Sequence, residues 1–338
     1  MKKVSIKDIA RMAGVSPSTV SFVLNGKARK MRIRDAVSEK IITIANKQGY
    51  QPNQVAVSLR TGQSNIIGLM VESISGSFFA ELSGVVQKEA EKFGYKVMYC
   101  STENNPDKGR DWLRTFSLQQ IDGYLVTPAP GMQKDIQGLE QLHKPVVLMD
   151  SYFPSLHVPC VLVDNYEGAA QGMDHLIGRG YRKIGFITVD LSLIQIELRE
   201  KAYTDYLKKH HIPVRKAHVL RMPYDCSRND AVLSICRFLE ENPELEAVFF
   251  ATNYLGVLGL ESLAKLRRQI KEDIAMLCFD DHDIFRLYPP GISVIRQPVE
   301  KIAQTAVHLL MEQLGKKKKK PRPVQTALPG KLIVRGSS

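Results

Sequence analysis

Hydrophobic and polar positions divide the chain into two stretches with different periods. Over residues 5–25 apolar residues recur at helical spacing, which predicts two short helices. Gly14 supplies the permissive backbone of a tight turn, and Ser16 and Pro17 suit the N-cap and first position of the second helix. A third amphipathic pattern covers residues 35–48. The amino-terminal end is therefore predicted to be an all-α unit.

Beyond residue 65, short apolar runs of strand length alternate with helical patterns. This alternation predicts parallel sheets covered by helices on both faces, and the length favours two lobes with a cleft over one very wide sheet. Strands are expected at 65–71, 95–100, 121–128, 144–150, 158–164, 183–189, 246–251 and 274–280, and helices at 79–94, 111–120, 165–179, 197–210, 227–240, 253–268 and 298–314.

Positive charge is concentrated at the amino-terminal end. Residues 1–60 contain 12 Lys and Arg against three acidic residues, within a chain of net charge +12. Five lysines at 316–320, with Arg322, carry a further +6, which is more than the remaining charge, so the rest of the body is slightly acidic. A basic head on a near-neutral body is typical of a protein that binds nucleic acid. The lysine run is expected to be a solvated loop, with an extra DNA contact as the alternative.

Several classes of protein are disfavoured by what the sequence lacks. No apolar run approaches the roughly 18 residues of a membrane helix, and the amino-terminal residues lack the apolar core of a secretory signal, so we expect a cytoplasmic, nucleoid-associated protein. The five cysteines form no C-x-x-C pair and are expected to be reduced and mostly buried. We find no G-x-S-x-G, H-E-x-x-H or phosphate-loop motif, and expect no catalytic residue, metal or cofactor.

The segments IKDIARMAGVSPSTVSFVLNG, GYQPNQVAVSLRTGQSNIIGLMV, FFAEL, FATN, CFDDHD and PPGISVIRQP resemble, in this order, signature blocks of the lactose-repressor (LacI) family. The resemblance implies a helix-turn-helix head at 1–50, a hinge helix at 51–63 and a periplasmic-binding-protein-like body at 64–338. Within the body we expect an N-lobe of 64–163 plus 293–322 and a C-lobe of 164–292 plus 323–338. The implied partners are a pseudo-palindromic DNA operator, a second copy of the chain, with a tetramer not excluded, and a small-molecule effector, expected to be a carbohydrate.

Short polar side chains at the start of the second helix suit the major groove. The family pattern adds a wedge, here Leu59, in the minor groove, with half-burial of Leu59 against the body as the alternative. Phe22 replaces the usual arginine, Val57 replaces an arginine of the hinge, and the loop at 27–32 is longer and more basic than usual. The residues expected at the DNA are Ser5, Ser16, Pro17, Ser18, Thr19, Ser21, Phe22, Asn25, Lys27, Arg29, Lys30, Arg32, Tyr50, Asn53, Val55, Ala56, Leu59 and Arg60.

Effector contacts are expected where strands end at the cleft. By resemblance they are Phe78, Phe79, Asp150, Arg199, Asn253 and Asp280. Carboxylates, an arginine, an amide and an aromatic face suit a sugar or a similar polyol. Each has a plainer interpretation: the aspartates could cap turns, Arg199 could face solvent, and at least one phenylalanine should be core. Tyr254 stands where the family often has aspartate.

The main hypothesis is a DNA-binding regulator, in its usual family role a repressor, whose operator affinity depends on an effector. The alternatives are control by a protein partner and, less favoured by the basic head, a sugar-binding transport protein.

Overall fold

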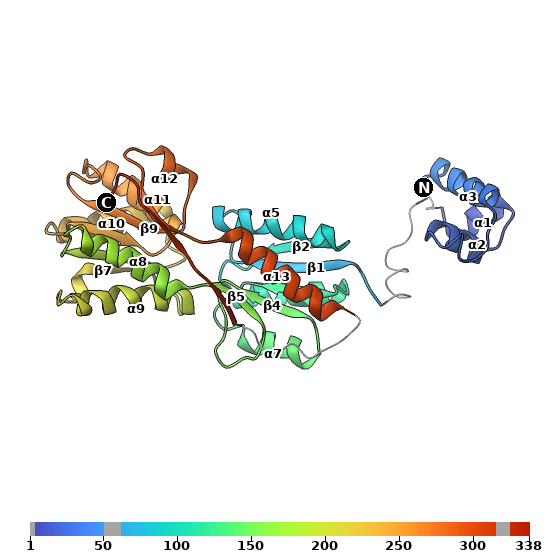
Figure 1. The fold of residues 1–338 in the computed structure, drawn as a ribbon, viewed down its shortest axis with the longest axis horizontal. Coiled ribbons are helices and arrows are strands. Elements are labelled where there is room, and N and C mark those ends of the chain that lie inside the picture. The colour runs from blue at the N-terminus through green and yellow to red at the C-terminus, as the bar shows by residue number, and fades with distance from the viewer. Residues whose placement is uncertain (1–3, 51–61, 316–324) are drawn as a thin grey trace. The chain divides into compact units, whose positions relative to one another are not determined.

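The computed structural model describes residues 4–50, 62–315 and 325–338. These residues form two compact units, one ending at Ser64 and one beginning at Asn65. The first is helical, and the second is an α/β body with two sheets (Figure 1). The predicted fold class is confirmed. The predicted hinge at 51–63 lies almost entirely outside the described residues.

The amino-terminal unit contains α1 (Ile6–Ala13), α2 (Pro17–Leu24) and α3 (Asp35–Lys47). All three helices contact one another around a small apolar core. Its buried members are Ile9, Ala10, Ala13, Val20, Val23, Ile41 and Ala45. The periodic apolar positions of the sequence are therefore the ones that hold these helices together.

The first lobe of the body is a parallel sheet with strand order β11-β5-β4-β3-β1-β2. Alternate residues of each strand face opposite sides, so α5 and α13 cover one face while α6 and α7 pack against the other. Its elements are β1 (Ile66–Val71), α5 (Ser77–Lys92), β2 (Lys96–Ser101), α6 (Pro106–Leu118), β3 (Gly123–Val126), α7 (Gln133–Gln141), β4 (Val146–Met149), β5 (Cys160–Val163), α13 (Val299–Leu314) and β11 (Gln325–Leu328).

The second lobe repeats this plan, with strand order β12-β10-β9-β8-β6-β7 and only β12 antiparallel to its neighbour. Helices α8 and α9 pack on one face and α10 and α11 on the other. Its elements are α8 (Asn165–Gly178), β6 (Ile184–Val189), α9 (Ile194–Lys209), the 3-10 turn η1 (Lys216–His218), β7 (Val219–Met222), α10 (Arg228–Glu241), β8 (Ala247–Phe250), α11 (Asn253–Lys265), β9 (Ala275–Phe279), α12 (Asp283–Leu287), β10 (Ser293–Arg296) and β12 (Lys331–Ile333).

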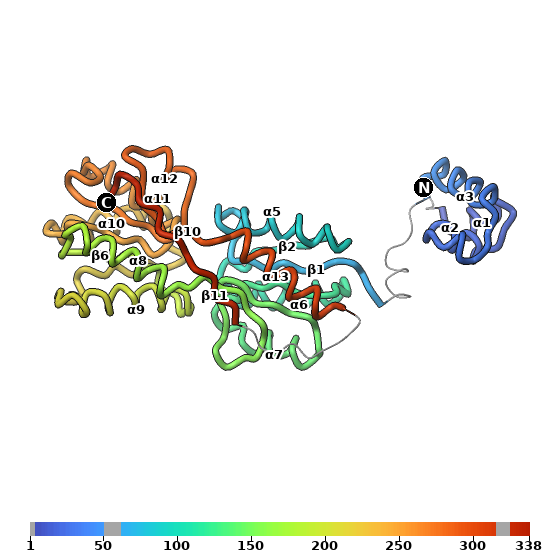
Figure 2. The backbone as a smooth tube through the Cα atoms, in the orientation of Figure 1, coloured from blue at the N-terminus to red at the C-terminus, as the bar shows by residue number. Residues whose placement is uncertain are grey.

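The chain crosses between the lobes after β5, after β10 and after β11, as the tube in Figure 2 traces. Two predicted lobe boundaries are therefore wrong. Residues 293–296, expected in the N-lobe, are strand β10 of the second sheet, and residues 325–328, expected in the C-lobe, are strand β11 of the first. Each segment adds a strand to the sheet of one lobe, and the chain then crosses to the other lobe.

The expected burial of most cysteines is confirmed among the described residues. None of the five forms a disulfide; four are buried and Cys226 is half-buried. No described helix has the length and apolar character needed to cross a membrane.

Candidate functional site

Helix α2 begins at a well-formed turn. Gly14 has φ 71°, a conformation that a residue without Cβ adopts easily, and it ends α1. The Ser16 hydroxyl then accepts a hydrogen bond from the Thr19 amide at 3.1 Å, and Pro17 occupies the first helical position. Ser5 and Asp8 form a reciprocal capping box at the start of α1. The turn and the caps thus determine where α2 begins and in which direction its first turn faces.

One face of α2 is buried and the other is open. Val20 and Val23 pack in the core, whereas Ser16, Pro17 and Ser18 are exposed. Thr19, Ser21 and Phe22 are half-exposed, so each retains surface that a ligand could touch.

The other residues of the head that were predicted to contact DNA differ in their exposure and hydrogen bonding. Asn25 turns back on the helix, its amide donating to the Ser21 carbonyl at 2.6 Å. Ser5 is exposed but its hydroxyl bonds Asp8, and Tyr50 packs against the apolar core. The cations of the loop after α2, Lys27, Arg29, Lys30 and Arg32, are all exposed. Asn53, Val55, Ala56, Leu59 and Arg60 lie outside the described residues.

The second candidate site is a cavity of about 440 Å³ between the two sheets of the body. It lies at the carboxyl ends of the parallel strands, the usual place for ligands in such sheets. All six predicted effector residues line it: Phe78, Phe79, Asp150, Arg199, Asn253 and Asp280.

Two aspartates occupy equivalent places in the cavity. Asp150 directly follows β4 and Asp280 directly follows β9, each the fourth strand of its lobe, and both have positive φ, at 62° and 71°. Gln195 donates to Asp150 at 3.1 Å, and Gln297 donates to Asp280 at 2.6 Å. Both aspartates are 8% exposed or less. They are therefore built into the wall of the cavity, as expected of ligand contacts.

Burial dominates the protonation of the cavity acids. It raises the pKa of Asp150 to about 7, with Arg199 opposing the shift and Asp280 and Glu72 adding to it. Burial likewise raises the pKa of Asp280, against the effect of Arg199 and Gln297. The pKa of Glu72, after β1, is also raised by burial, although hydrogen bonding with Tyr224 counteracts it. The acids of the cavity are thus held in surroundings that disfavour their charge.

Arg199 is the buried cation of the site, with 2% of its surface exposed. Its Nε donates to Asn165 at 2.9 Å and one terminal nitrogen donates to the Ala251 carbonyl at 2.7 Å. The guanidinium carbon lies 3.6 Å from the centre of the Phe279 ring. The interpretation of Arg199 as a solvated helix residue is excluded.

Hydrogen bonds join the lobes across the cavity. Asp150 of the first lobe accepts from Gln195 of α9, and Asn253 of α11 donates to Ser77 of the first lobe at 3.0 Å. Polar contacts that cross a cleft form or break when lobes move, so the opening of the cavity is coupled to these side chains.

Aliphatic side chains form another part of the cavity lining. Val189, Leu193 and Ile196 form a buried cluster that lines the cavity, and the rings of Phe78 and Phe79 meet edge to face at 5.0 Å. Phe79 is buried and Phe78 half-buried, so both phenylalanines contribute to the core as well as to the cavity. The site can therefore accept a ligand with one apolar side.

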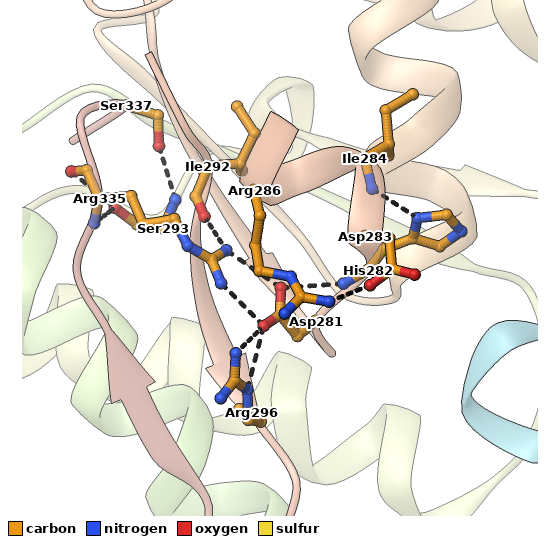
Figure 3. Close-up of polar contacts among 10 residues, drawn as sticks. All are labelled: Asp281, His282, Asp283, Ile284, Arg286, Ile292, Ser293, Arg296, Arg335 and Ser337. Carbon is orange, nitrogen blue, oxygen red and sulfur yellow. Dashed lines mark hydrogen bonds and ion pairs between the residues drawn. The ribbon is translucent and has the colours of Figure 1, made fainter. Parts of the chain in front are cut away.

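Asp281, next to Asp280, belongs to a separate cluster. Arg335 donates to its two carboxylate oxygens at 3.0 and 2.8 Å, and Arg296 Nε donates at 3.0 Å (Figure 3). Burial alone would raise the pKa of Asp281, but the hydrogen bonds from the two arginines outweigh it and lower the pKa. This cluster fastens the loop that carries Asp280 and His282 to strand β10 and to the segment after β12.

Comparison with known proteins places both sites in context. The family model for bacterial regulatory proteins of the lacI family matches residues 5–53, and a periplasmic binding protein-like domain matches residues 173–338. The chain belongs to the lacI family. It is accordingly a DNA-binding transcriptional regulator, as the resemblance of its motifs indicated.

Curated relatives cover nearly the whole lacI-family chain. The transcriptional repressor PurR of Haemophilus influenzae is 28% identical over 316 residues, covering 93% of this chain and 92% of that protein. The ribose operon repressor of Haemophilus influenzae is 29% identical, covering 92% of each chain. Among solved structures, the lac repressor dimer bound to operator and an anti-inducer has a TM-score of 0.85 at 21% identity, covering 99% of each chain. That likeness supports the fold of the whole chain.

The lacI-family resemblance did not identify every residue of the cavity. Glu72, Gln195, Gln297 and Tyr224 also line it. No motif spacing in the sequence identifies these four residues as cavity residues. Two features could have drawn attention to them: the apolar segment around Gln195 and the acidic residue directly after β1. Among the described residues, no group of three or more metal-binding side chains is arranged to hold a metal ion.

Proposed function

We propose that this protein is a transcriptional repressor that binds a two-fold symmetric operator as a homodimer, with an affinity set by a small polar effector in the interlobe cavity. The effector class that the cavity and the family suggest is a sugar or a sugar derivative. The single observation that carries the DNA-binding role is the exposed, capped first turn of α2 on a strongly basic head. The names of the relatives, a PurR repressor and a ribose operon repressor, support the sign of regulation.

Two groups of side chains would contact DNA, one at base edges and the other at phosphates. Ser16, Ser18 and the half-exposed Thr19 and Ser21 offer small donors and acceptors suited to base edges in the major groove. The exposed cations at 27–32 are suited to phosphates, which position the head without reading sequence. Phe22 has no donor, so its readout would be limited to apolar contact, such as with a thymine methyl group.

The hinge remains a prediction from the sequence. Leu59 is expected to enter the minor groove beside its counterpart from the second subunit, and Val57 removes a positive charge that relatives often have there. A segment that folds only on DNA would respond to small changes in lobe arrangement, because a coupling of about 1–3 kcal/mol is sufficient for regulation.

The test is selection of bound fragments from random DNA by the full chain. We expect one enriched, symmetric sequence whose affinity falls steeply with salt. Ser18→Ala should weaken or relax selection at one base pair of each half-site, by about 1 kcal/mol or more, whereas the matched change Asn46→Ala on the exposed side of α3 should leave the enriched sequence unchanged.

Three results would contradict the proposal. They are the absence of any enriched sequence, enrichment without two-fold symmetry, and equal loss in both variants. Repeating the selection with sugars separates effector control from control by a protein partner, since only the former changes affinity with purified components.

A further inference from the structure

The charges that line the cavity do not balance. The lining includes three acids, Glu72, Asp150 and Asp280, and two arginines, Arg199 and Arg228. Arg228 is exposed and donates to Glu261 at 2.7 and 3.1 Å, so its charge is compensated outside the cavity. Among the described residues of the lining, Arg199 is then the arginine whose positive charge can compensate the three carboxylates.

Among the described residues, no ion pair joins His282 to an acid of the cavity. His282 lines the cavity, and its Nδ1 accepts a hydrogen bond from the Ile284 amide at 3.1 Å (Figure 3). This ring nitrogen is therefore occupied by the backbone and does not bond a cavity carboxylate.

Arg199 is itself only partly available to the acids. Its hydrogen bonds go to Asn165 and Ala251, and its flat face lies on Phe279. The nearest acid is Asp280, with 3.6 Å between the charged atoms. Asp150 and Glu72 lie beyond that distance, so Arg199 acts on them only from farther away.

Among the described residues of this wall, two glutamine oxygens are buried acceptors without a donor, whereas the Asn104 amide nitrogen is a buried donor without an acceptor. Gln195 and Gln297, 4% and 5% exposed, each give their amide NH₂ to a cavity aspartate. The amide oxygens of both side chains are buried without a hydrogen-bond partner in the part of the chain described. Buried acceptors without donors are costly, so a ligand rich in donors suits this wall.

We infer that the effector of this cavity carries a positively charged nitrogen, held between Asp150 and Glu72 of the first lobe and Asp280 of the second, with its apolar side against Leu193 and Ile196. The inference rests on the proposed effector role of the cavity. The ligand would then be a small organic cation, such as an amine-bearing polyol. A neutral sugar would leave two carboxylates without a compensating positive charge.

A cation at this point would also act on the lobes. The acids come from opposite lobes, so bringing the lobes together without a ligand brings like charges together. A bound ammonium group reverses this effect, because it is attracted to both sides of the cleft. The charge of the ligand therefore favours the arrangement in which the lobes are close.

The experiment measures the melting temperature of the full chain with matched pairs of probes. The pairs are glucamine and sorbitol, 1,4-diaminobutane and 1,4-butanediol, and cyclohexylamine and cyclohexanol, each at equal concentration and constant ionic strength. At pH 8 we expect at least one amine to raise the melting temperature by about 2 °C or more beyond its alcohol, because a ligand of the folded form stabilises by mass action.

Two controls make the result specific. The difference should shrink at pH 6, where Asp150, surrounded by Glu72, Asp280 and Arg199, is mostly protonated, while all three amines stay charged. It should vanish in Asp150→Asn and persist in Asp174→Asn, which changes an exposed aspartate of α8. The pH comparison in the unaltered protein stands even where a variant fails to fold.

The inference is overturned where each alcohol matches or exceeds its amine, where no amine acts, or where the amine effect is unchanged at pH 6 or in Asp150→Asn. Operator binding, measured in parallel, separates the two proposals. A chain that binds its operator but ignores the amines refutes the cationic effector alone, whereas failure to select any operator refutes the proposed function.

Discussion

Asp280 and Asp281 are neighbours in the chain, yet they belong to regions with opposite electrostatics. Asp280 faces the cavity, where three acids share one buried arginine and the pKa of each acid is raised. Asp281 accepts hydrogen bonds from Arg296 and Arg335, and its pKa is lowered. Asp280 has a φ of 71°, so the chain turns sharply directly after β9, and one loop contributes to both regions.

The contrast separates two uses of a carboxylate. In the Asp281 cluster the charge is compensated by this chain, so the carboxylate stabilises the fold and positions the loop. In the cavity the compensation is incomplete, so the same type of side chain lowers stability and leaves an attraction for something from outside. A substitution that removes the charge should therefore have opposite effects in the two regions.

The largest effect is expected for Asp281→Asn. It leaves two arginines without their carboxylate, and breaking such a pair costs about 3 kcal/mol, the lower end of the range for buried ion pairs. Because the pKa of Asp281 is lowered by folding, the stabilisation exists above the unfolded pKa and is lost as the pH falls through the folded value. Urea unfolding at pH 7 measures the change, and a loss below about 1 kcal/mol would show that the arginines find other partners.

Asp150→Asn should have a smaller effect of opposite sign. The pKa of Asp150 is raised to about 7, so ionisation in the folded state opposes folding above the unfolded pKa. The penalty is absent near pH 4, grows between pH 4 and 7, and is complete at pH 8. The rise of this pKa to about 7 corresponds to about 4 kcal/mol at pH 8, and we expect about half of that gain because relaxation and water entering the cavity reduce the cost of the buried charge. Near pH 4 the variant should match the unaltered protein.

Thermal or urea unfolding at both pH values checks this sign. The asparagine can still accept the hydrogen bond from Gln195, so the comparison isolates the charge. A less stable variant at pH 8 would mean that Arg199 compensates Asp150 more fully than the distances indicate.

The sequence predicted the head better than the body because the head depends on local interactions. The turn at Gly14, the N-cap Ser16 and Pro17 act within a few residues of one another, and each is found as expected. The boundary at β11 was wrong because this strand joins a distant part of the chain, with Gln325 paired to Cys160 of β5. The boundary at β10 was wrong because the chain adds this strand beside β9 before it leaves the second lobe.

The cavity was predicted in part, for a similar reason. Asp150, Asp280 and Asn253 follow strands, and the carboxyl ends of parallel strands meet at one edge. Gln195 could not be found in this way, because it lies in α9 and reaches Asp150 from the other lobe, 45 residues along the chain. Gln297 directly follows β10, a strand that the hydrophobic pattern did not predict. The distinction between Asp280 and Asp281 required the positions of Arg296 and Arg335, which no spacing in the sequence reveals.

The smallest effect is expected for Asp283→Asn, which provides the reference for both larger changes. Asp283 lies two residues after Asp281 and pairs with Arg286, but 80% of its side chain is exposed. Water screens this pair, and exposed pairs contribute about 0.5 kcal/mol or less to the free energy of unfolding. Urea unfolding of the variant at pH 7 should therefore match the unaltered protein within that value. A loss as large as that of Asp281→Asn would mean that the whole loop, and not compensation by two arginines, determines stability here, and the contrast between cavity and cluster would no longer hold.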